Sequence, residues 1–186
     1  MFAAVVQAAK KAREAQSRES EEALLNRKLM LDKALIRGKR LLAAGKTNEA
    51  LESFKEAVSK YYHDEHSVFR VIGGALLDAS LPRPALPFLK KGLEKEGEDP
   101  GPMVELARAM EMLKEYEESL RYLKEALSHS GDDPDIMLNL GRVYALNKDP
   151  EKGLAMVRKV LEITPGSVKA KAMLPRLEKA AARARG

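Results

Sequence analysis

The sequence predicts an all-α protein, built as a solenoid of antiparallel helix hairpins with one extra helix at each end. Three observations lead to this prediction. Small residues recur at intervals of 34 or 35 residues, the segments between them are amphipathic with a helical period, and no segment alternates between polar and apolar residues. A single hairpin cannot bury its apolar stripe, so successive hairpins are expected to stack on one another.

The repeat is defined by four columns of matched residues. The first column is small and consists of Gly38, Gly73, Ala107 and Gly141. The second, again small, consists of Ala50, Ala85, Ser119 and Gly153. The two remaining columns are Phe54, Leu89, Leu123 and Val157, then Ala57, Gly92, Ala126 and Val160. Short side chains in the first two columns allow the helices of a hairpin to approach closely, and the bulky third column fills the space beside them.

Turn residues separate the helices. Hairpin turns are expected at 44–47, 80–83, 114–115 and 147–150, and the copies are divided by Asp, Gly and Pro clusters at 97–100, 131–134 and 164–167. Pro100, Pro134 and Pro150 stand where a helix can begin, since the first turn does not need the missing N–H. Pro82, Pro84 and Pro87 lie close together where the second helix of the second copy should begin. This helix is therefore expected to begin late or to tilt.

Composition excludes several classes of protein. The 186 residues are 45% hydrophobic and 33% charged, without Cys or Trp, so disulfides, thiolate–metal sites and Cys nucleophiles are excluded. No apolar run approaches the roughly 20 residues needed to span a membrane. The apolar N-terminal stretch is not preceded by positive charges, so a signal peptide is not expected and the protein is predicted to be cytoplasmic. Residues 1–45 and 166–186 are basic, whereas the middle is acidic.

These columns resemble the tetratricopeptide repeat. The last copy carries the most of its signature, with Met137, Leu140, Gly141, Tyr144 and Pro165. The resemblance covers residues 31–165 and implies a right-handed α-solenoid of four repeats: 31–64, 65–99, 100–133 and 134–166. It further implies a protein that binds other proteins. No phosphate-binding loop, nucleophile elbow or zincin motif is present, so neither catalytic activity nor a cofactor is expected.

The resemblance also implies a binding site, because in this family the first helix of each hairpin lines a concave groove. The residues expected to contact a partner are Leu35, Lys39, Leu42, Arg70, Leu77, Val104, Arg108, Glu111, Met112, Leu138 and Arg142. Lys39, Arg108 and Arg142 occupy the same place in their copies, which suggests a ladder of cations that binds an extended or helical segment with acidic groups. The alternative is that these cations are solvent-exposed residues that bind no partner and only make the protein soluble.

Some relatives bind the C-terminal carboxylate of a chaperone through a clamp of Lys, Asn and Arg. Here Leu35, Val71 and Glu105 stand at the clamp positions, and only Asn139 fits. We therefore do not expect a role in binding chaperone tails.

The two ends are expected to be helical. Residues 1–30 predict one long helix, with a bend allowed near Ser17–Ser20, that caps the stack or serves dimerisation or docking. In a third interpretation, residues 2–9 resemble the last helix of a bacterial receiver domain. Residues 167–186 predict a capping helix that begins at Ser167 and is kinked or broken near Pro175. The basic tail after it is expected to be frayed, and weak binding of this tail to anionic surfaces is an alternative role.

Chemistry-bearing clusters are sparse. His63 and His66 flank Asp64 and Glu65, but one loop alone rarely supplies enough metal ligands, so a polar loop without metal is expected.

The leading functional hypothesis is an adaptor or scaffold. The alternatives are a regulatory module of a longer signalling protein, and a binder of nucleic acid or acidic surfaces through the basic ends, against which the acidic middle argues.

Overall fold

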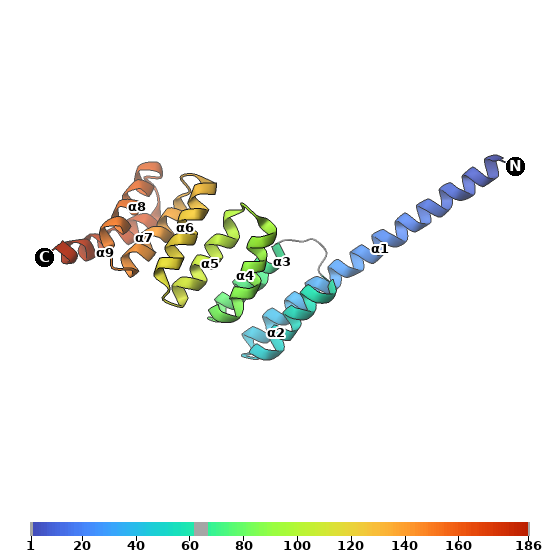
Figure 1. The fold of residues 1–186 in the computed structure, drawn as a ribbon, viewed down its shortest axis with the longest axis horizontal. Helices are drawn as coiled ribbons and strands as arrows, with labels where there is room; N and C mark the ends of the chain where they lie inside the picture. Colours follow the sequence, from blue (N-terminus) through green and yellow to red (C-terminus); the bar gives the residue numbers. More distant parts are fainter. Residues whose placement is uncertain (1, 62–66, 186) are drawn as a thin grey trace. The chain divides into compact units, whose positions relative to one another are not determined.

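The structure is a computed structural model that describes the backbone of residues 2–61 and 67–185, and side chains from residue 20 onward within those ranges. These described residues form nine α-helices and one π-helical segment, with no strand among them, which confirms the predicted all-α class. The chain divides into two compact units, Met1–Val68 and Phe69–Gly186. Figure 1 shows the helices in chain order.

The first unit contains α1 (Phe2–Ala43), α2 (Thr47–Glu56) and the π-helical segment η1 (Ala57–Tyr61). Figure 1 shows α1 as one long helix, so the predicted N-terminal helix and the first helix of the first repeat are a single element. Leu31 and Phe54 are buried where α1 packs on α2. The buried hydroxyl of Ser53 donates to the carbonyl of Ala34 at 3.0 Å, which satisfies a polar group at this contact.

The second unit is a stack of hairpins in which each helix packs on the next. Its elements are α3 (Ser67–Asp78), α4 (Pro82–Glu96), α5 (Pro100–Met112), α6 (Tyr116–Ser130), α7 (Pro134–Leu146), α8 (Pro150–Ile163) and α9 (Val168–Arg185). The starts of α4, α6 and α8 are 34 residues apart, and so are those of α5, α7 and α9. The predicted boundary between residues 64 and 65 lies outside the described residues.

The predicted late start of α4 is wrong. The helix begins at Pro82, in register with α6 and α8. Pro82 and Pro84 lie in the first turn, whose N–H groups have no partner within a helix, so neither ring removes a hydrogen bond. Pro87 lies inside the helix, which continues to Glu96.

The small-residue columns pack as predicted. A Cβ atom on Gly38 would overlap the ring of Phe54, and one on Gly73 would overlap the side chain of Leu89. In the last hairpin a Cβ on Gly141 would lie 3.1 Å from the carbonyl oxygen of Gly153. The bulky third column is correspondingly buried in every copy, at Phe54, Leu89, Leu123 and Val157.

All four hairpin turns share one backbone conformation. One residue in each turn has a positive φ: Gly45, Ser80, Lys114 and Lys148. In the last turn the N–H of Lys148 donates to the Ala145 carbonyl, and the N–H of Asp149 donates to the Tyr144 carbonyl at 2.9 Å. This pair of bonds is the Schellman motif, which satisfies the free carbonyls at a helix end.

The C-terminal helix differs from the prediction. The expected cap is confirmed, since Ser167 Oγ accepts from the N–H of Ala170 at 3.3 Å. However, α9 is not broken at Pro175, and it stays helical to Arg185. Leu177 and Ala181 are buried against the last hairpin, and Arg185 lies 3.0 Å from Glu151. The predicted fraying is wrong because α9 buries an apolar face.

No helix in the described ranges is long and apolar enough to cross a membrane.

Candidate partner-binding groove

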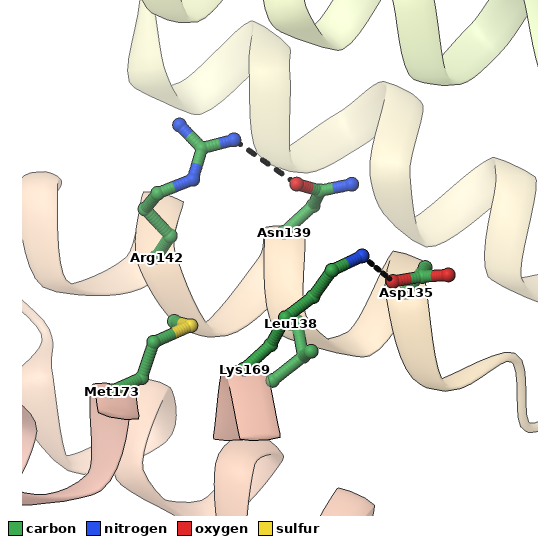
Figure 2. A pocket seen from close by; sticks show the side chains of 6 residues that line it. All are labelled: Asp135, Leu138, Asn139, Arg142, Lys169 and Met173. Atoms are coloured by element: carbon green, nitrogen blue, oxygen red, sulfur yellow. Dashed lines mark hydrogen bonds and ion pairs between the residues drawn. The ribbon is translucent and has the colours of Figure 1, made fainter. Parts of the chain in front are cut away.

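A hollow of about 560 Å³ lies between the first helix of the last hairpin, α7, and the helix that follows that hairpin, α9. Six side chains line it: Asp135, Leu138, Asn139, Arg142, Lys169 and Met173. Figure 2 shows the first four projecting from α7 and the last two from α9. Met173 and the small accessible part of Leu138, which is 6% exposed, supply apolar surface, whereas the other four bring hydrogen-bonding and charged groups to the same space.

A second, smaller hollow continues this surface onto α5. Its lining includes Val104, Arg108 and Glu111 of α5, together with Asn139 and Arg142 of α7. Asn139 and Arg142 line both hollows, so they join the α5 surface to the α9 surface. We call the combined surface over α5, α7 and α9 the groove.

Three cations of the groove are each paired with a carboxylate that lies two helices earlier in the chain. Arg108 of α5 donates to Asp78 of α3 at 2.6 Å, and Lys169 of α9 donates to Asp135 of α7 at 2.8 Å. Between them, Arg142 of α7 is paired with Glu111 of α5. Each pair therefore connects alternate helices of the stack, α3 with α5, α5 with α7 and α7 with α9. A partner's carboxylate has to compete with an internal one.

The electrostatic environment of Arg142 is distinctive. Burial lowers the pKa of its guanidinium, and the nearby positive charge of Arg108 lowers that pKa further. Its second partner is Asn139, whose Oδ1 accepts a hydrogen bond from Arg142 at 3.0 Å. A partly desolvated cation beside another cation favours an additional anionic partner. The pKa of Lys169 is instead raised, chiefly by its hydrogen bond to Asp135.

The predicted site residues fall into three groups. Val104, Arg108, Glu111, Leu138 and Arg142 line the groove. Leu35, Lys39 and Leu42 lie on α1, in the other compact unit, so the groove defined here does not include them. Met112 is exposed at the end of α5.

Two predicted residues are placed elsewhere. Leu77 is only 1% exposed, so little of its side chain is available for contact with a partner. The adjacent Asp78 is exposed and pairs with Arg108 of α5. Arg70 lies near the carboxylate of Glu96 at 4.0 Å and beside Gly101, where α4 connects to α5.

Lys169 and Met173 are absent from the predicted site, because the sequence of residues 167–186 indicates only a cap. A usable signal nevertheless exists in the sequence. Lys169 follows Asp135 by one 34-residue period, and Met173 follows Asn139 by the same interval. The helix α9 thus presents side chains as the first helix of a further repeat would.

The described residues contain no group of three or more His, Asp or Glu side chains suited to a metal ion. His63 and His66 lie outside the described residues, as do Asp64 and Glu65. His129 is exposed in the last turn of α6.

The fold defines a class of protein, the helical-repeat solenoid. Residues 113–177 match the family model of the tetratricopeptide repeat. This part of the chain therefore carries the tetratricopeptide repeat, which confirms the resemblance seen in the sequence. No curated protein matches the sequence.

Solved structures show the same fold. A tetratricopeptide repeat protein from Parabacteroides merdae is 17% identical with a TM-score of 0.68, covering 83% of this chain and 61% of that one. A thermophilic protein of this class from Thermus thermophilus is 22% identical with a TM-score of 0.62, covering 82% and 84%. The first such domain of Spaghetti (RPAP3), bound to the HSP90 peptide SRMEEVD, is 18% identical with a TM-score of 0.59, covering 63% and 94%.

Proposed function

We propose that the chain is a scaffold that recruits another protein by binding a segment of it in the groove over α5, α7 and α9. The observation that carries this proposal is the hollow between α7 and α9, where Arg142, Asn139 and Lys169 surround the apolar side chains of Leu138 and Met173. Concave sites that combine apolar contact area with a few polar groups are typical of ligand binding.

The chemistry of the groove fits a segment that carries both acidic and apolar side chains. A carboxylate can accept hydrogen bonds from Arg142, whose planar guanidinium suits such a partner, and from Lys169. An apolar side chain next to it can pack against Leu138 and Met173. The peptide bound by Spaghetti (RPAP3) combines acidic and apolar residues in the same way.

The proposal is tested with fluorescently labelled peptides of about seven residues that contain Glu, Asp, Leu and Met. Matched peptides carry Gln and Asn in place of the acids. We expect the acidic peptides to bind more tightly than the neutral ones, and the combined substitution Arg108→Ala and Arg142→Ala to weaken that binding at least about tenfold.

Two controls make this result specific. Lys169→Ala should weaken binding as well, because Lys169 lines the larger hollow. Lys171→Ala removes an exposed cation of the same helix that does not line the hollow, and should leave the affinity unchanged. Equal affinity of the parent and the double variant for the acidic peptides would contradict the proposal.

A further inference from the structure

A second exposed apolar surface lies on α1, in the first compact unit. Leu25, Leu29 and Ile36 are 67%, 48% and 50% exposed. Their spacings of four and seven residues place all three on one face of the helix, which we call the α1 stripe. Leu31 and Ala34, which are buried, lie on the other side. Single exposed leucines are common in proteins, but three aligned on one face indicate an unoccupied contact surface.

The charges along the α1 stripe have opposite signs at its two ends. Glu22 lies one turn before Leu25, and Arg40 lies one turn after Ile36. A hollow of about 430 Å³ adjoins the basic end, lined by Lys33, Ile36, Arg37, Arg40 and Leu41. Within the described side chains, Lys33 and Arg40 form no ion pair, whereas Arg37 lies 3.8 Å from Glu56.

The order of charges at its two ends makes the ends of the stripe complementary when it is reversed. We propose that two copies of the chain pair antiparallel through α1, with Leu25 of each copy packed against Ile36 of the other. In this register Glu22 of each copy is level with Lys39 of the other, and Arg40 lies one residue further, about 1.5 Å along the axis, within reach of the same carboxylate. Asp32, near the middle of the stripe, then faces Leu29 of the other copy. Two-fold symmetry makes every contact twice, as in an isologous dimer.

The pairing fills the features left open in a single copy. Leu25 of the second copy enters the hollow beside Ile36, and its Glu22 supplies the carboxylate that Arg40 lacks. The segment from Glu22 to Arg40 is about 27 Å long at 1.5 Å per helical residue. An anionic membrane surface fits less well, since Glu22 and Asp32 bring negative charge to the stripe or its edge.

Charge reversal tests the proposal through sedimentation of the full chain. We expect the parent chain to be a dimer, and either Glu22→Arg or Arg40→Glu alone to weaken self-association at least about tenfold, because each creates a like-charge contact twice. The chain that carries both substitutions should recover much of the association, since the pair is then reversed but complementary. Failure of the double variant to recover would contradict the register.

Apolar substitutions provide a matched comparison. Leu25→Glu removes a residue of the stripe and should yield monomers, whereas Met30→Glu alters a side chain that is 43% exposed on another face of α1 and should leave the dimer intact. A monomeric parent chain at all concentrations up to about 100 μM would overturn the proposal. So would dimers that Leu25→Glu leaves unchanged.

The orientation is tested by cross-linking, for which the absence of cysteine provides a clean background. Chains with Leu25→Cys are mixed with chains carrying Ile36→Cys under mild oxidation. We expect the mixed disulfide to form much faster than either symmetric one, because antiparallel pairing in this register places the two Leu25 positions about 16 Å apart along the axis. Preferential symmetric cross-links would indicate a parallel pair and overturn the proposal.

Flotation with vesicles containing phosphatidylserine is the last test, and a monomer that binds them through Leu25 would likewise overturn it.

Discussion

The side chain of Leu89 occupies the space that a Cβ atom on Gly73 would need. Both residues are buried where α3 meets α4, and the equivalent pair in the first hairpin is Gly38 with Phe54. Close approach of two helices at one residue thus makes glycine necessary at that position. At the next residue, Gly74, a Cβ atom would have no neighbour within 4 Å, so two consecutive glycines have different roles.

Substitution of these two glycines should have effects of opposite sign. Gly73→Ala is expected to lower the free energy of unfolding by about 1–2 kcal/mol, because displacing Leu89 costs more than the gain in helix propensity. Gly74→Ala should raise it by about 0.5–1 kcal/mol through helix propensity alone. Urea titration monitored by circular dichroism measures both. Equal effects at the two positions would contradict the close packing of α3 on α4.

The hairpin turns offer a stabilising substitution. Lys148 has a φ of 62°, a conformation that costs an L-residue with a Cβ atom more than it costs glycine. Lys148→Gly should therefore raise the free energy of unfolding by about 0.5–1 kcal/mol. Asn147→Gly is the matched control, because Asn147 has a φ of −83° and gains nothing from glycine. Thermal denaturation compares the two variants, and stabilisation by both or by neither would contradict the turn geometry.

The C-terminal helix should contribute to stability rather than fray. Leu177 is buried in the cluster formed by α7, α8 and α9, where it covers Gly153. Leu177→Ala is expected to cost about 2–4 kcal/mol, as large-to-small changes in a core do. Arg176→Ala, at an exposed position of the same helix, should have little effect. Hydrogen exchange of α9 gives a second readout, and rapid exchange of its amides in the parent chain would contradict the docked helix.

Asp149 should make the start of α8 sensitive to acid. A hydrogen bond from the Lys152 side chain lowers the pKa of this carboxyl, as does a second from the Lys152 backbone. A carboxyl whose pKa is lower in the folded state stabilises it above the unfolded value, near 3.8, and loses this effect as pH falls through the folded value. Asp149→Asn should therefore lower the melting temperature at about pH 7, and the difference should shrink progressively as pH falls below 3.8. A difference that does not change with pH would contradict the ion pair.

If the groove binds acidic segments, Glu111 competes with them for Arg142. Glu111→Gln should then raise the affinity for an acidic peptide about three- to tenfold without changing that for a neutral peptide. Glu118→Gln is the control, since Glu118 pairs with Arg121 on α6, away from the groove. Isothermal titration calorimetry measures the affinities. An increase for both peptides, or for neither, would contradict competition at Arg142.

The repeat was predictable because it depends on contacts close in the chain. Gly73 and Leu89, or Gly141 and Gly153, lie within one hairpin, so the same steric requirement recurs in each copy and appears in the sequence as a 34-residue period. The Schellman turns were less visible, because Ser80, Lys114 and Lys148 occupy positions where glycine is the usual signal.

The groove was predictable only in part. Sequence and resemblance together selected Arg108 and Arg142, but they did not show that Asp78 and Glu111 pair with them. Those partners lie about one period away, and whether two side chains meet across neighbouring hairpins depends on the rotation and spacing of the helices. The sequence by itself therefore determined the hairpins and their period, through local steric fit. Only the tertiary structure decided which cations are already paired, because charge pairing depends on distances of a few ångströms between separate hairpins.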